Sequence, residues 1–142
     1  MNHEDTKTRR RLRVASALPP ETERIAKEVI DAAFQVHSAL GPGLLENVYE
    51  ACLCHELHRR GIPFIRQLSL PILYQGIRLD AGLRLDLLIA DVLIVEIKSV
   101  EAHNPLFEAQ LLTYLKLTGH RLGLLINFNV PVIKDGIKRL VR

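Results

Sequence analysis

Two carboxylates and a lysine stand close together in strongly apolar sequence. Asp86 interrupts the apolar run of residues 85–89, and Glu96 and Lys98 follow in the apolar run of residues 92–98. An isolated ionised group is costly to bury, so these side chains must be paired, bind a metal ion or lie at the edge of a cleft. Carboxylate oxygens are hard ligands that suit Mg²⁺ or Mn²⁺, and two of them suffice because Mg²⁺ keeps several of its waters.

The spacing of the three residues predicts how they meet. Runs that are apolar on both faces are typical of a strand in a covered sheet. Side chains two apart along a strand share a face, so Glu96 lies beside Lys98. If residues 90–92 form a three-residue hairpin loop, the strands pair so that Asp86 lies opposite Glu96. A two-residue loop would shift the register by one and separate the two acids.

Hydrophobic spacing predicts the elements that position these residues. A period near 3.6 indicates helices, and a period of two indicates strands. The strand–helix–strand segment from residue 92 to residue 128 is expected to be a right-handed parallel crossover. The order predicts an α/β fold with a central mixed sheet flanked by helices. We expect helices at residues 21–40, 45–60 and 105–118, strands at 64–70, 72–74, 77–79, 83–89, 92–98, 121–128 and 137–141, and turns at 75–76 and 80–82.

Composition is that of an ordinary globular domain. The chain has 142 residues, of which 48% are hydrophobic and 25% charged, values typical of soluble proteins. No uninterrupted apolar stretch approaches the ~18 residues of a membrane span. Cys52 and Cys54 are too close in sequence to staple a fold, so a cytoplasmic location is expected.

The positive charge is concentrated at the start of the chain. Residues 1–20 carry the whole formal excess of +3, and residues 21–142 have equal numbers of acidic and basic groups. We interpret residues 1–20 as a basic, disordered tail before a single domain at residues 21–142. A basic arm can also contact phosphates. The candidate nucleic-acid-binding residues of the tail are Arg9, Arg10, Arg11 and Arg13.

Further polar residues complete a recognisable pattern. Glu46 begins the second helix after Gly41-Pro42-Gly43, and the third helix carries Gln110 and Tyr114 one turn apart. Together with the aspartate of one strand and Glu96-Ile97-Lys98 of the next, this pattern resembles the PD-(D/E)XK nuclease superfamily. The resemblance implies a restriction-endonuclease-like αβββαβ core.

A closer resemblance is to the GxxExxY family, a branch of that superfamily. The segment Gly43-Leu44-Leu45-Glu46-Asn47-Val48-Tyr49 is similar to the signature of that family. Residues 57–63 and the closing segments 124–128 and 134–137 are similar too. The resemblance covers residues 23–142 in matching order.

The resemblance implies a role for each candidate residue. Asp86, Glu96 and the backbone carbonyl of Ile97 would hold Mg²⁺ or Mn²⁺, with Glu46 as a further ligand. Lys98 would orient the attacking water or stabilise the pentavalent phosphate. Gln110 and Tyr114 would position Lys98 or the substrate backbone.

The implied activity is Mg²⁺-dependent hydrolysis of phosphodiester bonds in DNA or RNA. An alternative is a nuclease fold kept for binding nucleic acid or a protein partner with little turnover. A homodimer that cuts two strands is also left open. DNA cannot be distinguished from RNA, nor endonuclease from exonuclease, by these residues.

Overall fold

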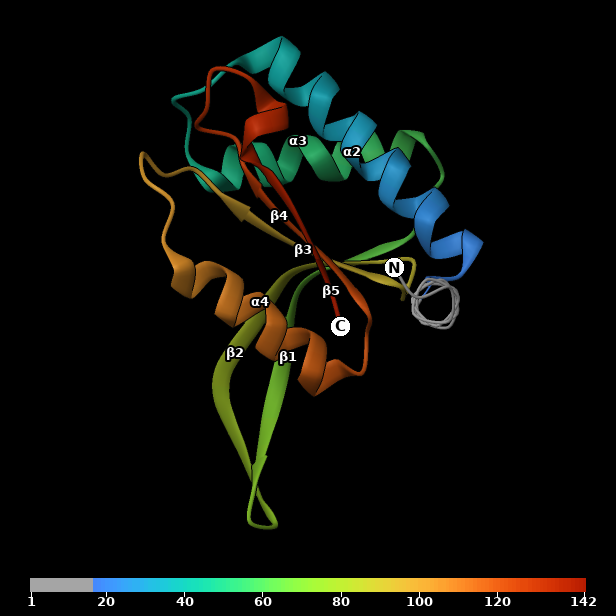
Figure 1. Ribbon diagram of the computed structural model, residues 1–142, viewed down its shortest axis with the longest axis vertical. Coiled ribbons are helices and arrows are strands. Elements are labelled where there is room, and N and C mark those ends of the chain that lie inside the picture. Colours follow the sequence, from blue (N-terminus) through green and yellow to red (C-terminus); the bar gives the residue numbers. More distant parts are fainter. Residues whose placement is uncertain (1–16) are drawn as a thin grey trace, which may run out of the picture.

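The computed structural model describes residues 17–142, which form a mixed five-stranded sheet between helices. Figure 1 shows two helices together on one side of the sheet and a third helix on the other. Among the described residues, no helix is long and apolar enough to cross a membrane. The elements are α2 (Pro20–Leu40), α3 (Glu46–Arg59), β1 (Phe64–Tyr74), β2 (Ile77–Ile89), β3 (Leu93–Lys98), α4 (Pro105–Thr118), β4 (Leu122–Asn127), the short 3-10 helix η1 (Ile133–Gly136) and β5 (Ile137–Val141).

The topology confirms the predicted core. Strands lie in the order β1-β2-β3-β4-β5, and only β3 and β4 are parallel. Helix α4 connects these two strands, as expected of a strand–helix–strand crossover. Elements α3, β1, β2, β3, α4 and β4 therefore form the restriction-endonuclease-like αβββαβ core, preceded by α2 and followed by β5.

The hairpin between β2 and β3 has the predicted register. Ile89 pairs with Leu93, which leaves three residues in the loop. Ala90 and Asp91 both adopt positive φ angles, of 50° and 56°, and the Val92 N–H donates to the Ile89 carbonyl at 3.0 Å. Both residues accept the left-handed conformation because the tight turn requires it.

Each face of the sheet has its own hydrophobic core. The core beneath α2 and α3 includes Val29, Leu53 and Leu124, and the core beneath α4 includes Ile94 and Leu111. Tyr49 stacks on Phe128 in the first core, with ring centroids 4.5 Å apart. The sheet is thus buried on both sides at its centre, as its apolar strands predicted.

Strands β1 and β2 are longer than expected. The expected turn at residues 80–82 is wrong, because β2 continues through it to Ile77. The register shifts between Leu70 and Ile72, so the three residues that looked like a turn are accommodated as an irregularity in the ladder. The two strands extend beyond the rest of the sheet as a ribbon (Figure 1).

The ribbon turns over where Asp86 lies. Leu85 and Leu87 are two residues apart in β2, yet Leu85 packs in the core beneath α4 and Leu87 in the core beneath α2 and α3. A regular strand would place both on one face. Opposite Asp86, Gln67 of β1 has a positive φ of 52°, which marks a sharp local twist. This irregularity brings polar side chains to the boundary between the two cores.

The loop before α3 is held by two hydroxyl groups. The Tyr49 hydroxyl donates to the Gly41 carbonyl at 2.6 Å and accepts the Leu44 N–H at 3.1 Å. From the end of β3, the Ser99 hydroxyl donates to the Leu44 carbonyl at 2.5 Å. Residues 41–45 are therefore fastened both to α3 and to the sheet, which fixes where Glu46 starts the helix.

We expect Tyr49→Phe to lower the free energy of unfolding by about 1–3 kcal/mol, because the Leu44 N–H and the Gly41 carbonyl lose their partner. Urea unfolding followed by circular dichroism measures this change. Tyr74→Phe is the matched control, since that side chain is 62% exposed on the ribbon, and its effect should stay within about 0.5 kcal/mol. Equal effects of the two substitutions would contradict the role of Tyr49.

Candidate functional site

Strands β2 and β3 stop pairing through their backbones just where the two acids lie. The last ladder pair is Leu87 with Val95. Beyond it the Asp86 N–H donates to Glu96 Oε1 at 3.0 Å, and the Ile97 N–H donates to Asp86 Oδ2 at 2.8 Å. Each carboxylate therefore accepts a hydrogen bond from a backbone N–H of the opposite strand. At this point side chains, rather than backbone groups, connect the two strands.

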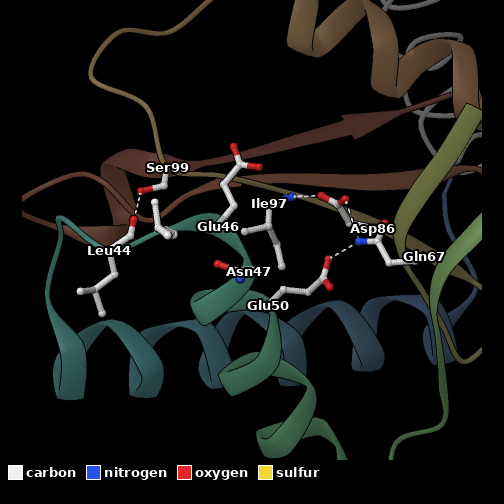
Figure 2. Close-up of a pocket in the computed structure, with 9 residues that line it drawn as sticks. Leu44, Glu46, Asn47, Glu50, Gln67, Asp86, Ile97 and Ser99 are labelled. Carbon is white, nitrogen blue, oxygen red and sulfur yellow. Dashed lines mark hydrogen bonds between the residues drawn. The ribbon is translucent and has the colours of Figure 1, made fainter.

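A cleft of about 610 Å³ opens beside this point, between α3 and the sheet. Helix α3 contributes Glu46 and Glu50 from successive turns, and the sheet contributes Asp86 and Ile97. Figure 2 shows Glu46, Glu50 and Asp86 around the same space, with Gln67 between Glu50 and Asp86. The described lining residues are Leu44, Leu45, Glu46, Asn47, Glu50, Gln67, Asp86, Ile97 and Ser99.

Glu50 is tied to β1 through both of its oxygens. Glu50 is only 6% exposed. Oε2 accepts from Arg66 Nε at 2.8 Å, and Oε1 accepts from Gln67 Nε2 at 2.7 Å. The same Gln67 amide lies 3.4 Å from Asp86 Oδ1. The amide thus bridges the acid of α3 and the acid of β2 (Figure 2).

The second acid of the pair is strongly perturbed. Glu96 is 4% exposed, and burial raises its pKa to about 8, with repulsion from Asp86 as the second cause and Lys98 acting in the opposite direction. The pKa of Tyr114 is also raised, first by burial and then by Glu96 and Asp86. A low-dielectric position that holds two neighbouring carboxylates strongly favours an added cation or a proton.

Lys98 lies on the side of the sheet that α4 covers. Its Nζ is 4.5 Å from the centroid of the Phe107 ring, a cation–π contact. It lines a groove together with the exposed Gln110 of α4. The described residues that line the acidic cleft include no lysine or arginine. Lys98 therefore acts on Glu96 from the α4 side of the sheet and not from within the cleft.

The structure brings most of the candidate residues to one junction. Asp86 and Glu96 meet through hydrogen bonds, and Glu46 and Ile97 line the adjoining cleft. Tyr114 is buried on the α4 side of the sheet. Burial raises its pKa, and it lies close enough to Glu96 and Asp86 for these acids to raise the pKa further. Lys98 and Gln110 flank that side and do not line the cleft. The tail residues Arg9, Arg10, Arg11 and Arg13 lie outside the described part of the chain.

Sequence reasoning missed Glu50 and Gln67. Glu50 stands four residues after Glu46, and that spacing places both acids on one side of a helix, so the signal was present. Gln67 gave no such signal, because its position depends on the left-handed turn of β1 and on the pairing of β1 with β2.

The oxygen atoms of these residues are suitable ligands for a hard divalent cation. Among residues 17–142, no three His, Cys, Asp or Glu side chains converge on one point. Mg²⁺ needs no such cage, since one or two carboxylates with waters and substrate phosphate serve it. Ile97 adds a backbone oxygen on the correct side, because the N–H and C=O of a strand residue point the same way and its N–H faces Asp86. These donors fit Mg²⁺ or Mn²⁺.

Comparison with known families gives one match. A family model described as the PD-(D/E)XK nuclease superfamily matches residues 23–140, which is most of the chain and nearly all of the described fold. No curated protein and no solved structure matches the chain.

The buried acid predicts an unusual pH dependence of stability. Between pH about 4.5 and about 8 the folded protein holds a proton on Glu96 that the unfolded chain has released. Stability from this group therefore falls as pH rises through that window, by at most ~1.4 kcal/mol per pH unit. Urea unfolding in EDTA at pH 5.5 and 7.5 should show a loss of about 1–3 kcal/mol that Glu96→Gln abolishes.

The matched control for this measurement is Glu101→Gln, which changes an exposed acid just after β3. It should leave the pH dependence of the parent protein intact. Parallel pH dependences for the parent and Glu96→Gln would show that Glu96 is ionised in the folded protein throughout this range.

Proposed function

The chain belongs to the PD-(D/E)XK nuclease superfamily, and we propose that it hydrolyses phosphodiester bonds of DNA or RNA with the help of Mg²⁺ or Mn²⁺. The observation that carries this proposal is the pair of carboxylates at the break between β2 and β3. Asp86 and Glu96 each accept a backbone N–H at that break. Asp86 lines the open acidic cleft, and Glu96 is buried next to it. Such a pair is an unbalanced negative charge that a divalent cation neutralises.

In this proposal Asp86, Glu96 and the Ile97 carbonyl hold the cation, and Glu46 adds a contact directly or through water. When bound, the metal ion supplies positive charge to the scissile phosphate and lowers the pKa of a water. Gln67 keeps Asp86 in place, and the Arg66–Glu50 pair keeps Gln67 in place. The protein thus holds the donors in position before substrate arrives.

Lys98, Gln110 and Tyr114 act from the α4 side in the same proposal. Lys98 orients the attacking water or neutralises charge on the phosphate as it becomes five-coordinate. Gln110 shares a groove with Lys98 and positions it or the substrate backbone. Tyr114, buried near both acids, closes the site on the α4 side. The Phe107 ring holds the Lys98 ammonium near the site until substrate binds.

We also assign the chain to the GxxExxY branch of the superfamily. Support comes from the physical role of the motif residues. The glycine-rich loop from Gly41 allows the chain to enter α3, Glu46 faces the cleft, and Tyr49 fastens the loop with its hydroxyl. The residues of the signature therefore act together to place Glu46 at the cleft.

One observation favours a second function. Because Lys98 Nζ rests over Phe107 and the cleft residues carry no lysine or arginine, the fold also suits a module that binds nucleic acid or a protein with little turnover. The two functions differ in their dependence on the acids. Binding alone would survive loss of Asp86, whereas hydrolysis would not.

We expect Asp86→Asn to lower Mn²⁺ affinity by more than about 100-fold, since a ligand and a negative charge are lost together. Isothermal titration calorimetry measures the affinity, and cleavage of labelled single- and double-stranded DNA and RNA measures the activity, which should disappear. Asp91→Asn is the matched control, because Asp91 lies in the β2–β3 turn with an 88% exposed side chain. No metal-dependent cleavage by the parent protein and unchanged Mn²⁺ binding by Asp86→Asn would refute the proposal.

Lys98→Met should separate metal binding from chemistry. The variant keeps an unbranched chain over Phe107 but loses the charge, so Mn²⁺ affinity should rise slightly or stay constant while cleavage falls by about 10²–10³-fold. Lys116→Met on the same side of the sheet is the control, with unchanged cleavage expected. Full cleavage by Lys98→Met would remove Lys98 from the proposed site.

A further inference from the structure

Where it leaves the sheet, the β1–β2 ribbon has one apolar face and one polar face. On the apolar face, Leu68, Leu70 and Leu83 pack against the core beneath α4. The alternate positions point away from α4, because neighbouring residues of a strand face opposite sides. These positions include Ser69, which pairs with Arg84. The polar face therefore begins at Asp86 and Gln67 and runs outward along the ribbon.

Arg84 is the first charged residue on this face beyond the two acids. It is exposed, and within the described residues its side chain forms no hydrogen bond or ion pair. Further out, Arg78 pairs with Leu73 in the ladder. Its contact with Asp80 is 3.4 Å long between side chains that are 67% and 78% exposed, so water and salt weaken it greatly. Both guanidinium groups are accessible to a ligand.

The cleft itself repels a polyanion. Glu46, Glu50 and Asp86 line it, and Glu96 lies just behind. The guanidinium of Arg66 is already bound to the cleft residue Glu50. A metal ion neutralises only the phosphate at the acids, so flanking phosphates need cations outside the cleft. The polar face of the ribbon supplies them in line with Asp86.

We propose that the polar face of the β1–β2 ribbon is a phosphate track, on which Arg84 and then Arg78 bind the backbone of a nucleic-acid strand that leaves the acidic cleft. The proposal rests on the proposed nuclease function for the direction of the strand. According to this proposal the ligand of the ribbon is a nucleic-acid polymer and not a single nucleotide. Two-stranded ribbons are a known means of contacting nucleic acids.

The spacing of the ribbon can be compared with the phosphate spacing of a stacked, helical nucleic-acid strand. Arg84 is two residues from Asp86, about 7 Å along β2. Phosphates follow one another at about 3.4 Å of axial rise per strand, so Arg84 reaches a phosphate about two nucleotides from the acids. Arg78 pairs with Leu73, six residues along β1 from Gln67, or about 20 Å. The track thus spans about six nucleotides.

Salt-dependent binding tests the track without any cleavage. Full-length protein is titrated in EDTA against fluorescein-labelled 20-nucleotide DNA, 20-nucleotide RNA and a 20-base-pair duplex, and anisotropy gives the affinity at several NaCl concentrations. Arg84→Gln should weaken binding and reduce the slope of log affinity against log salt by about 0.7 for a single strand or about 0.9 for a duplex. Arg84→Glu should weaken binding further, and Arg78→Gln should reduce the slope again.

Lys116→Gln is the matched control, since it removes one exposed positive charge from α4. It should leave affinity and slope unchanged. Parent-like slopes for Arg84→Gln and Arg84→Glu, or equal losses for Lys116→Gln, would overturn the track, even if Asp86→Asn abolishes cleavage. A reduced slope in a protein that never binds Mn²⁺ or cleaves would leave the track standing and overturn the nuclease function instead. The substrate whose affinity falls most with Arg84→Gln identifies the bound polymer.

Discussion

The organisation of this protein depends on the place where β2 and β3 stop forming backbone hydrogen bonds with each other and two carboxylates bind the backbone N–H groups instead. Asp86 and Glu96 replace ladder hydrogen bonds with bonds from their own side chains to the N–H groups at this break. The exchange satisfies buried donors that would otherwise be unpaired. The cleft between α3 and the sheet opens beside this break. Because both acids are engaged in this way, neither can move far without breaking the sheet.

Burial at this break creates an electrostatic conflict that the fold leaves unresolved. Two carboxylates lie side by side, one of them almost fully buried, and the nearby lysine is held on the α4 side over an aromatic ring. The protein compensates by raising the pKa of Glu96 to about 8. A group that is expensive to ionise is well suited to exchange its proton for a metal ion, so in the proposed function a metal ion and a proton compete for Glu96.

The outer elements maintain this conflict. Tyr49 and Ser99 fasten the loop that starts α3, and Glu50 fastens α3 to β1 through Arg66 and Gln67. The left-handed Gln67 accepts backbone strain to place its amide between two acids. From the same twist the ribbon carries its exposed arginines away from the cleft. The rigid support of the acidic cleft and the placement of the exposed arginines of the ribbon therefore both depend on one irregularity.

The sequence alone predicted the order of the helices and core strands, and it predicted the meeting of Asp86 with Glu96 on the condition that the β2–β3 loop has three residues. These features follow from short-range rules, since hydrophobic period and loop length operate over a few residues. The Asn104 cap of α4, whose Oδ1 accepts the Leu106 N–H at 3.0 Å, was predictable for the same reason. Only the tertiary structure decided the features that depend on the twist and pairing of the strands. These are the continuous β2, the change of face at Asp86, and the positions of Gln67, Glu50 and Lys98. Twist accumulates along paired strands and is set by packing against helices far away in the chain, so no local pattern of residues encodes where a face turns over.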